Sequence, residues 1–493
     1  MPTIAFRVDA SSIVGSGHAI RCAALAGQLR AHGADVCFIC REQPGDWCDW
    51  LANQGYAVHR LPVQEGGVSP GVDAAQTCAA LSNSKPVEWL VTDHYGIDHR
   101  WELAAREVAR RILVIDDLAD RSHDCDFVLN QNFSNAPDNL YAALVPPGTK
   151  ILLGPRYALL RPEFAMLRST SRHRGGDVRR ILICFGGADP QNHTGAALQA
   201  LRGYIRDIDR VDVVVGPGNP HKQSIAALCA DTPNAVLHCP ASEIAELLSK
   251  ADLAIGGGGT MNWERSCLGV PTVAFGIAAN QRKVLEALIE AGYVLGVAEM
   301  QTPHVERIAA WIGSALGNAP LLRGLSRRVA SLTDGLGAER VVDLMLPTKL
   351  DFRQATIDDT DLIFRCRNDP TVRGVSIDSR EISRETHDAW MSRTLSSPER
   401  ILLVAGSGGE PRGVVRFDLR PPEAVISVYR VPSGSIARLG LIRQATLWFR
   451  SRFPNIKRVV AEILPENTAS LVAFRAAGYH DGMYVLETDL DDL

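Results

Sequence analysis

Short apolar runs alternate with longer segments of helical periodicity over the first 345 residues of the chain. The apolar runs that read as buried strands are 4–8, 34–40, 89–93, 111–116, 126–130, 179–187, 211–216, 235–239, 253–257 and 272–276. This alternation predicts an α/β fold, in which helices cover both faces of parallel sheets. Ten strands are too many for one Rossmann-type sheet and fit two. We therefore expect Rossmann-like domains at 1–155 and 156–345, with a seam in the Pro- and Gly-rich segment 147–162.

The pattern changes after residue 349. A hairpin over 401–419 has its turn at Ser407–Pro411, and further strands then alternate with helices. These later elements are a strand at 425–431, a helix at 441–453, a strand at 458–464 and a helix at 468–478. Their order predicts a separate α+β domain over 350–493, which is long enough to fold around its own core.

Composition narrows the classes of function. Hydrophobic residues make up 46% of the chain and the formal net charge is -4, so nothing indicates nucleic acid or an anionic membrane as a partner. No stretch approaches the roughly 18 apolar residues of a membrane span, and no signal segment precedes the first strand. The 11 cysteines are scattered, and Cys37 and Cys40 form a CxxC within an apolar strand, which fits buried thiols better than a zinc or redox pair. We expect a cytoplasmic protein. Its oligomeric state is left open.

A histidine stands at the start of the first expected helix. The turn Gly15-Ser16-Gly17 follows the first strand, and the helix runs from His18 to its end at Gly33. In a first turn the backbone N–H groups lack partners and the helix dipole is positive, which favours a neutral imidazole able to accept a proton. A polar side chain that only faces solvent is the alternative. The residues expected to pack this helix on the sheet are Ile20, Ala23, Ala24, Gly27 and Ala31.

Four consecutive glycines, Gly256–Gly259, connect the strand at 253–257 through Thr260 to a helix that starts near Met261. Glycines let a diphosphate approach the backbone, and the N–H groups at the helix start bind negative charge. Glu264, one turn inside the helix, is placed to accept hydrogen bonds from sugar hydroxyls. A flexible turn with a surface glutamate is the alternative, and the run of four glycines makes it the weaker one.

Other polar residues fall at the carboxyl ends of expected strands. Gly186-Gly187 form a second glycine loop, and the amides Asn280-Gln281 either bridge a sugar or base or cap a helix. Asp93 and the pair Asp116-Asp117 could orient His18, bind sugar hydroxyls or cap the next helix. Two adjacent carboxylates also raise the question of Mg²⁺. Because neighbouring strand residues point to opposite faces, we expect no metal.

Six segments, in this order along the chain, carry a resemblance to a known family: 6–22, 92–98, 114–121, 185–192, 256–271 and 278–281. Together they resemble the UDP-sugar hydrolases of pseudaminic acid biosynthesis, a pathway linked to flagellin glycosylation. These enzymes release UDP from UDP-2,4-diacetamido-2,4,6-trideoxy-β-L-altropyranose. The resemblance spans residues 1 to about 345. It implies a GT-B-like pair of Rossmann domains that uses water as acceptor and needs no cofactor.

Taken residue by residue, the resemblance implies that His18 is the catalytic base, that Tyr95 and Asn280 lie in the active site, and that Glu264 contacts the ribose. The candidate UDP-sugar-binding residues are Gly17, Gly186, Gly187, Gly257, Gly258, Gly259, Thr260, Glu264 and Gln281. Attack of water opposite the diphosphate would invert C1, and no acid is needed at a leaving diphosphate. Two alternatives stay open. One is a GT-B glycosyltransferase with an alcohol acceptor, and the other is a nucleotide-sugar sensor without catalysis.

The segment at 466–479 resembles the GNAT acetyltransferase superfamily, because Asn467 and Ser470 precede a small-residue helix that ends at Gly478. An ordinary capped helix would also explain Asn467 and Gly478. The resemblance implies acetyl-CoA as co-substrate, with its pyrophosphate at the turn after the strand at 425–431. The candidate acetyl-CoA-binding residues are Arg438, Gly440, Asn467 and Ser470.

The chain departs from the GNAT pattern at two places. In the expected glycine-rich turn at 435–440 only Gly440 is in register, and Phe474 stands where many relatives carry a tyrosine that acts as general acid. The resemblance implies N-acetylation of the 4-amino group of a UDP-4-amino-4,6-dideoxy sugar just before hydrolysis, in one bifunctional chain. A degenerate, non-catalytic domain is the alternative.

Overall fold

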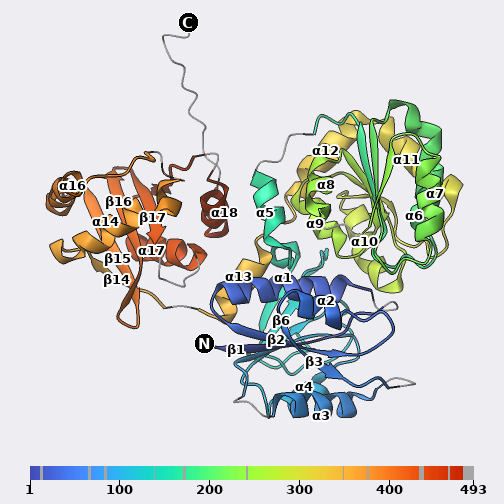
Figure 1. Cartoon of the computed structure of the whole chain (residues 1–493), viewed down its shortest axis with the longest axis horizontal. Helices are drawn as coiled ribbons and strands as arrows, with labels where there is room; N and C mark the ends of the chain where they lie inside the picture. The colour runs from blue at the N-terminus through green and yellow to red at the C-terminus, as the bar shows by residue number, and fades with distance from the viewer. Residues whose placement is uncertain are drawn as a thin grey trace, which may run out of the picture. The chain divides into compact units, whose positions relative to one another are not determined.

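The structure, a computed structural model, describes residues 1–493 except for 12–14, 65–67, 83–85, 138, 170–173, 240–242, 348, 375, 377, 432–437, 465–466 and 481–493. The chain forms two compact units, Met1–Val342 and Asp343–Leu493 (Figure 1). The first unit contains a seven-stranded and a six-stranded sheet, and the second contains a five-stranded sheet.

The first sheet is parallel and has the strand order β3-β2-β1-β4-β5-β6-β7. Its strands are β1 (Thr3–Val8), β2 (Asp35–Arg41), β3 (Ala57–Leu61), β4 (Trp89–Asp93), β5 (Ile112–Ile115), β6 (Phe127–Asn130) and β7 (Lys150–Leu153). The helices are α1 (Gly17–Ala31), α2 (Cys48–Asn53), α3 (Pro70–Leu81) and α4 (His99–Ala105). Helices α1 and α2 cover one face of the sheet, and α3 and α4 cover the other (Figure 1).

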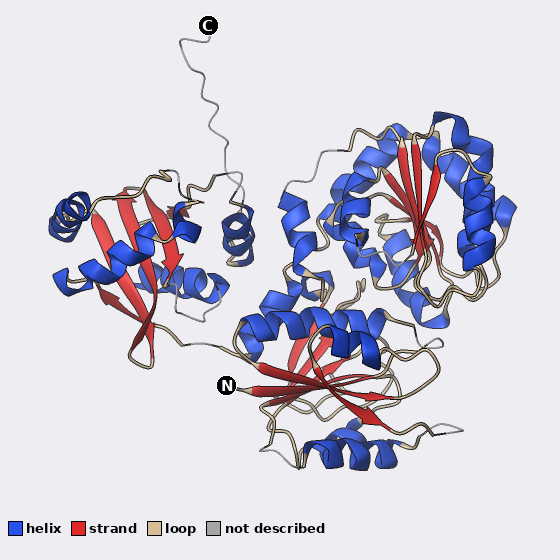
Figure 2. Ribbon diagram, viewed as in Figure 1, coloured by secondary structure: helices blue, strands red, loops and turns tan. Residues whose placement is uncertain are grey.

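The second sheet is also parallel, and helices cover both of its faces (Figure 2). Its strands, in the order β10-β9-β8-β11-β12-β13, are β8 (Arg180–Cys184), β9 (Arg210–Val214), β10 (Ala235–His238), β11 (Leu253–Gly257), β12 (Thr272–Phe275) and β13 (Leu295–Val297). The α-helices are α5 (Pro162–Ser169), α6 (His193–Leu201), α7 (Lys222–Ala230), α8 (Ile244–Lys250), α9 (Met261–Cys267), α10 (Arg282–Glu290), α11 (Val305–Leu316), α12 (Ala319–Ala330) and α13 (Gly337–Met345). Short 3₁₀ turns are η1 (Pro155–Tyr157), η2 (Arg202–Asp207) and η3 (Ala279–Gln281).

Both sheets reverse their strand order at one point, between β1 and β4 in the first and between β8 and β11 in the second. Ligands of doubly wound sheets bind outside the carboxyl ends of the strands at such a point. The strands at these points are buried on both faces, as parallel sheets require, and β4 and β11 are buried along their whole length. The two reversal points therefore mark where a functional site is expected.

All ten expected strands are present, but the structure adds β3, β7 and β13. Strand β7 lies inside the segment that the sequence marked as a seam, so this segment completes the first sheet before the chain leaves it. Edge strands β3 and β7 keep several residues exposed, and β13 has only three residues. Short or half-exposed strands lack the continuous apolar run that reveals a buried one.

The expected packing face of α1 is wrong. Gly27 and Ala31 are exposed, and Ile20 and Ala23 are only partly buried. The buried residues of this helix are His18, Ala19, Arg21, Cys22, Ala24, Leu25, Ala26 and Leu29. The sequence pattern left open whether His18 only faces solvent, and it named no role for Arg21. Both are buried because carboxylates of the sheet bind them.

A buried cluster of charges ties the first sheet to its helices. Asp73 of α3 accepts hydrogen bonds from Arg7 Nε at 3.0 Å, from Arg41 Nη2 at 2.7 Å and from Trp101 Nε1 at 2.9 Å. Arg7 also donates to Asp9, which directly follows β1. Burial opposes the ionisation of Asp73, but its bonds to Arg7 outweigh this effect and lower its pKa to about 2. The cluster joins β1, β2, α3 and α4.

The second unit has the sheet order β14-β15-β16-β17-β18, in which only β17 and β18 are parallel to each other. The strands are β14 (Asp351–Gln354), β15 (Arg400–Ser407), β16 (Glu410–Arg420), β17 (Glu423–Arg430) and β18 (Arg458–Val460). The helices are η4 (Ile357–Asp359), α14 (Thr360–Asn368), α15 (Pro370–Arg373), α16 (Arg384–Ser396), α17 (Arg438–Arg452) and α18 (Thr468–Ala476). Leu403 packs with residues of α17 and α18, whereas Leu402 packs with residues of α14 and α16. The expected α+β order is therefore present.

Within the described residues, no helix combines the length and the apolar character that a membrane span needs.

We expect Asp73→Asn to lower the free energy of unfolding at pH 7 by about 3 kcal/mol, because it leaves buried arginine charge without its partner. The pKa of Asp73 is lower in the folded chain than its ordinary value. The stability that this carboxylate contributes is thus present above about pH 4 and is lost as the pH falls towards 2. Urea unfolding at pH 7 and pH 3 measures both effects, and the variant should lose less stability between these pH values than the parent. The exposed Asp35→Asn variant is the control, and equal unfolding free energies for Asp73→Asn and the parent would contradict this account.

Candidate active site

His18 lies at the reversal point of the first sheet. It occupies the first turn of α1, and its Nδ1 is 2.6 Å from Oδ1 of Asp93, the last residue of β4. The strands β1 and β4 are neighbours here, with Val8 opposite Asp93. An unprotonated Nδ1 would set its lone pair against a carboxylate oxygen, so the proton of the neutral ring lies on Nδ1 and Nε2 is the acceptor. His18 is 7% exposed, which excludes a side chain that only faces solvent.

Arg21 lies one turn further along α1 and binds two carboxylates. It donates to Asp93 through Nε and Nη2, each at 2.6 Å, and to Asp117 through Nη1 and Nη2, each at 2.9 Å. Burial opposes the ionisation of Asp93, but the charge of Arg21 and the hydrogen bonds from Arg21 and His18 hold its pKa far below the ordinary value. The pKa of Asp117 is lowered for the same reason, with Arg21 outweighing burial. Both carboxylates therefore stay charged around one buried guanidinium.

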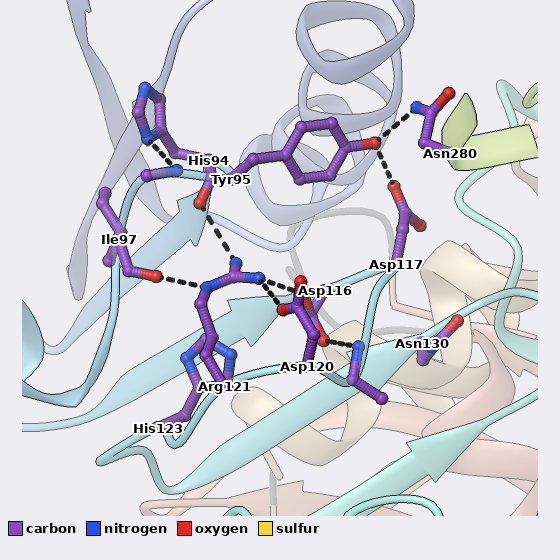
Figure 3. Close-up of polar contacts among 12 residues, drawn as sticks. His94, Tyr95, Ile97, Asp116, Asp117, Asp120, Arg121, His123, Asn130 and Asn280 are labelled. Atoms are coloured by element: carbon purple, nitrogen blue, oxygen red, sulfur yellow. Dashed lines mark hydrogen bonds and ion pairs between the residues drawn. The ribbon is translucent and has the colours of Figure 1, made fainter. Parts of the chain in front are cut away.

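Tyr95 connects this cluster to the second sheet. Its hydroxyl donates to Asp117 Oδ2 at 3.1 Å and accepts from Asn280 Nδ2 at 3.0 Å, as Figure 3 shows. Asn280 lies on η3, which follows β12. The ring of Tyr95 stands edge-on to the ring of His18, with centroids 4.8 Å apart. Burial and then the charge of Asp117 raise the pKa of Tyr95, so its hydroxyl stays protonated at neutral pH.

The adjacent carboxylates Asp116 and Asp117 have separate partners, as expected for neighbours that point to opposite faces. Asp116 accepts from Tyr141 at 2.7 Å and forms an ion pair with Arg121 at 3.2 Å. Asp117 binds Arg21 and Tyr95 instead. Among the described residues, no group of three His, Cys, Asp or Glu side chains is arranged to hold a metal ion.

The four glycines at the end of β11 and directly after it serve two different needs. A Cβ on Gly256 would lie 2.1 Å from the carbonyl oxygen of Cys184, so glycine is required here because β8 and β11 pack closely. At Gly257 and Gly259 the nearest atoms to such a Cβ would be 3.5 Å and 3.4 Å away, so packing does not require glycine there. The packing of neighbouring atoms therefore explains the glycine at Gly256 but not those at Gly257 and Gly259.

The N–H groups of this loop are not all free. The Gly258 N–H donates to Phe275 O and to Gln281 Oε1, both at 3.2 Å. Gln281 also accepts from the Ile277 N–H at 3.2 Å, so its side-chain oxygen holds the loop in place. In the described part of the chain, no acceptor is found for the N–H groups of Gly259 and Thr260. These two groups, at the start of α9, are the donors that can face an anion.

Two side chains that sequence reasoning missed support the loop from within α9. Arg265 donates to the carbonyl of Gly257 and to Asn262 Oδ1, and Asn262 Nδ2 donates to the carbonyl of Gly258 at 2.8 Å. Both residues are at least 97% buried, with exposures of 1% for Arg265 and 3% for Asn262. Their spacing of three residues on one helix, directly after a glycine run, is the signal that could have identified them.

The glycine loops of the two sheets lie against each other. A Cβ on Gly17 would be 3.2 Å from Thr260 Oγ1, and a Cβ on Gly187 would be 3.4 Å from Ser16 Oγ. Gly186 has φ +101°, a conformation that favours glycine. The turn before His18 therefore lies next to both glycine loops of the second sheet.

Glu264 lies on α9, one turn inside the helix, and is partly buried. Burial raises the pKa of Glu264 to about 7, against the opposing charges of Arg161 and Arg265. Hydrogen bonds donated by hydroxyl groups of a ligand would stabilise the ionised form of this carboxyl group.

In the second unit, Asn467 caps α18, and its side chain accepts from the Ser470 N–H at 3.1 Å. The chain turns at Gly478 with φ +100°, and Phe474 packs edge-on against Tyr479. This geometry is that of an ordinary capped helix. Gly440 is buried in α17, which begins at Arg438. The side chain of Arg438 and residues 435–437 of the expected turn at 435–440 lie outside the described residues.

Comparison with known proteins finds relatives at modest identity. A family described as a protein of unknown function (DUF354) matches residues 196–301, a minority of the chain. The chain is 28% identical over 292 residues to the UDP-2,4-diacetamido-2,4,6-trideoxy-β-L-altropyranose hydrolase of Campylobacter jejuni, covering 59% of this chain and 97% of that protein. It is 23% identical over 410 residues to an uncharacterized protein of Methanocaldococcus jannaschii, covering 81% of this chain and 80% of that one. The crystal structure of Acinetobacter baumannii MurG is similar over 70% of this chain and 100% of its own, with 17% identity and a TM-score of 0.49.

The glycine loop offers a matched pair of substitutions. We expect Gly256→Ala to lower the free energy of unfolding by about 2 kcal/mol or more, because its Cβ would clash with the backbone of β8. Gly259→Ala should stay within about 0.5 kcal/mol of the parent, because its Cβ meets only ordinary contacts. Urea unfolding of the two variants tests this difference. Equal losses of stability in the two variants would contradict the conclusion that packing requires glycine at Gly256 but not at Gly259.

Proposed function

We propose that the first unit hydrolyses a UDP-sugar to UDP and free sugar with inversion at the anomeric carbon, and that the substrate is UDP-2,4-diacetamido-2,4,6-trideoxy-β-L-altropyranose. The observation that carries the proposal is the His18–Asp93 pair, 2.6 Å apart, at the end of a turn whose Gly17 lies against Thr260. A base and an anion-binding loop are thus adjacent, as cleavage of a sugar–diphosphate bond requires. The 28% identity to the Campylobacter hydrolase, over 97% of that protein, supports the substrate class.

The diphosphate binds at the start of α9. The N–H groups of Gly259 and Thr260 and the positive end of the helix dipole meet its charge, which grows as the C1–O bond breaks. Gly186 and Gly187 bring the loop after β8 to the same place. Because a diphosphate departs as an anion, protonation of the leaving oxygen is not needed. Glu264 accepts hydrogen bonds from the ribose hydroxyls, which stabilise its carboxylate.

His18 activates the attacking water. Asp93 keeps the proton on Nδ1, so the lone pair of Nε2 accepts a proton from water as the oxygen bonds to C1. The imidazolium that forms is stabilised by the Asp93 carboxylate. Attack on the face opposite the diphosphate gives inversion. Tyr95 and Asn280, joined by a hydrogen bond of 3.0 Å, bound the space where the sugar lies.

We propose a second activity for the second unit, N-acetylation of a UDP-4-amino-4,6-dideoxy sugar by acetyl-CoA. The C–S bond of acetyl-CoA breaks, an amide bond forms, and the proton released by the amine offsets the one that the CoA thiolate takes up. The parallel pair β17–β18, connected through α17, supports this proposal because a helix start after a strand is a phosphate site. Acetylation would supply the acetamido group that the hydrolase substrate carries at C4.

For the hydrolase, we expect His18→Asn to lower kcat by at least about 100-fold, because it removes the base that takes the proton from water. The Kd for UDP should stay within about two-fold of the parent value, since the proposed diphosphate donors, the N–H groups of Gly259 and Thr260, lie directly before α9 and not on α1. UDP release measured by chromatography and UDP binding measured by calorimetry check the two expectations. His32→Asn, at the other end of the same helix, is the matched control. Turnover by His18→Asn within a few-fold of the parent would overturn the assignment of the base.

For the acetyltransferase, we expect the full chain to release CoA from acetyl-CoA when the UDP-4-amino sugar is present. Chromatographic detection of CoA avoids interference from the 11 protein thiols. His18→Asn should release CoA at the parent rate, because His18 belongs to the hydrolase. A UDP-sugar with a hydroxyl in place of the amine should give only background release. CoA release no faster than background in the presence of the amino sugar would contradict the proposed acetyltransferase activity.

A further inference from the structure

Tyr95 belongs to a short turn, His94–Ile97, that directly follows β4. Its hydroxyl bridges Asp117 and Asn280, and its ring stands against His18, so a small shift of the turn would move all three contacts. Ile97 anchors the end of the turn in the apolar core of the first sheet, whereas Tyr95 and Gly96 are not fully buried. The less buried part of the turn, around Tyr95, is held by polar contacts of its neighbours.

Arg121 holds the backbone of this turn. Its Nε donates to the carbonyl of Ile97 at 2.7 Å, and its Nη2 donates to the carbonyl of His94 at 3.4 Å, as Figure 3 shows. The two carbonyls flank Tyr95. The side chain of Arg121 is only 18% exposed, so these bonds are largely shielded from water. A single guanidinium therefore spans the turn.

Asp116 anchors Arg121. Its Oδ1 is 3.2 Å from Arg121 Nη1, while its Oδ2 accepts from Tyr141 at 2.7 Å and from the Ala119 N–H at 2.8 Å. The Asp116 carboxylate is buried, and these bonds leave it little freedom to move. Arg121 is consequently held at one end by an ion pair with a buried, well-anchored carboxylate.

His94 braces the same turn and is not a second base. Its Nδ1 accepts from the Gly96 N–H at 3.0 Å, and its Nε2 lies 3.3 Å from Asp9 Oδ2. Both ring nitrogens are thus engaged when the ring is neutral, with the proton on Nε2. A Cβ on Gly96 would lie 2.9 Å from His94 Cε1, so the brace needs glycine at this position.

We propose that Arg121 and Asp116 are positioning residues for Tyr95, acting from the side of the turn opposite to Asp117. The adjacent carboxylates at the end of β5 then have one shared purpose: Asp117 binds the tyrosine hydroxyl, and Asp116 fixes the tyrosine backbone through Arg121. Neither role needs a metal ion. The inference rests on the proposed hydrolysis, in which Tyr95 bounds the space for the sugar next to His18.

The test is a double-mutant cycle on UDP-sugar hydrolysis with Arg121→Gln and Tyr95→Ala. A glutamine at position 121 cannot bind the carbonyls of both His94 and Ile97. We therefore expect Arg121→Gln to lower kcat by about 10- to 100-fold, the effect of displacing a side chain of the site by about 1 Å. The Kd for UDP should change less than about two-fold. In the Tyr95→Ala background the same substitution should cost less than about two-fold in kcat, because its effect passes through Tyr95.

Asp120→Asn is the matched control, because Asp120 is 55% exposed and pairs with Arg121 on the surface at 2.8 Å without touching the turn. It should leave kcat unchanged. The proposal would be overturned if the effects of Arg121→Gln and Tyr95→Ala on kcat multiplied independently. A loss of UDP affinity as large as the loss of kcat would overturn it as well.

Hydrogen exchange keeps this inference separate from the proposed function. Amide exchange over residues 94–97 should speed up at least about ten-fold in Arg121→Gln and stay at the parent rate in Asp120→Asn. If the parent chain hydrolyses no UDP-sugar, the proposed function fails while the exchange measurement still decides whether Arg121 fixes the turn. Unchanged exchange in Arg121→Gln would contradict the positioning role whatever the activity.

Discussion

The guanidinium of Arg21, buried between the carboxylates of Asp93 and Asp117, is the interaction on which the candidate active site depends. A buried charge is costly unless its partners satisfy it fully, and here two carboxylates share one cation through four hydrogen bonds. Each carboxylate then has a lone pair left for one more donor. Asp93 uses it to orient His18, and Asp117 uses it to hold Tyr95. One arginine thus fixes both rings that face the proposed sugar site.

Much of the fold was predictable because parallel strands are buried on both faces. Continuous apolar runs revealed ten strands, and their alternation with helices revealed two doubly wound sheets. The strands that escaped detection are edge strands or very short, and β7 was hidden in a segment rich in Pro and Gly. The position of His18 at a helix start was also predictable, since a glycine turn after a strand signals it.

The buried polar contacts were not predictable from periodicity. The face of α1 was assigned from its small and apolar residues, and that pattern gave no reason to expect Arg21 to be buried. A buried arginine is stable here because the fold supplies carboxylates at the ends of β4 and β5. Sequence reasoning raised the possibility that Asp93 orients His18 but could not choose it over sugar binding or capping. That choice depends on a contact between residues 75 positions apart. Likewise Gly256 differs from Gly259 only through what packs against it in space.

The second unit shows the limit of a motif. Asn467 and Gly478 have the geometry of a capped helix, so these two residues by themselves do not distinguish an acetyltransferase from another α+β domain. The order of strands and helices, and not these residues, is what supports acetyl transfer. In the first unit, by contrast, the proposal rests on the site residues themselves, because contacts bring them together from both sheets.

The most direct test of the central claim is hydrolysis of UDP-2,4-diacetamido-2,4,6-trideoxy-β-L-altropyranose in ¹⁸O-labelled water, with no other acceptor present. Mass spectrometry of the products locates the label, and proton NMR during turnover reports the anomer formed first. Attack of water at C1 should give UDP without label and a free sugar that carries ¹⁸O at C1 with inverted configuration. Release of UDP only after an alcohol acceptor is added, or label in UDP instead of the sugar, would contradict it.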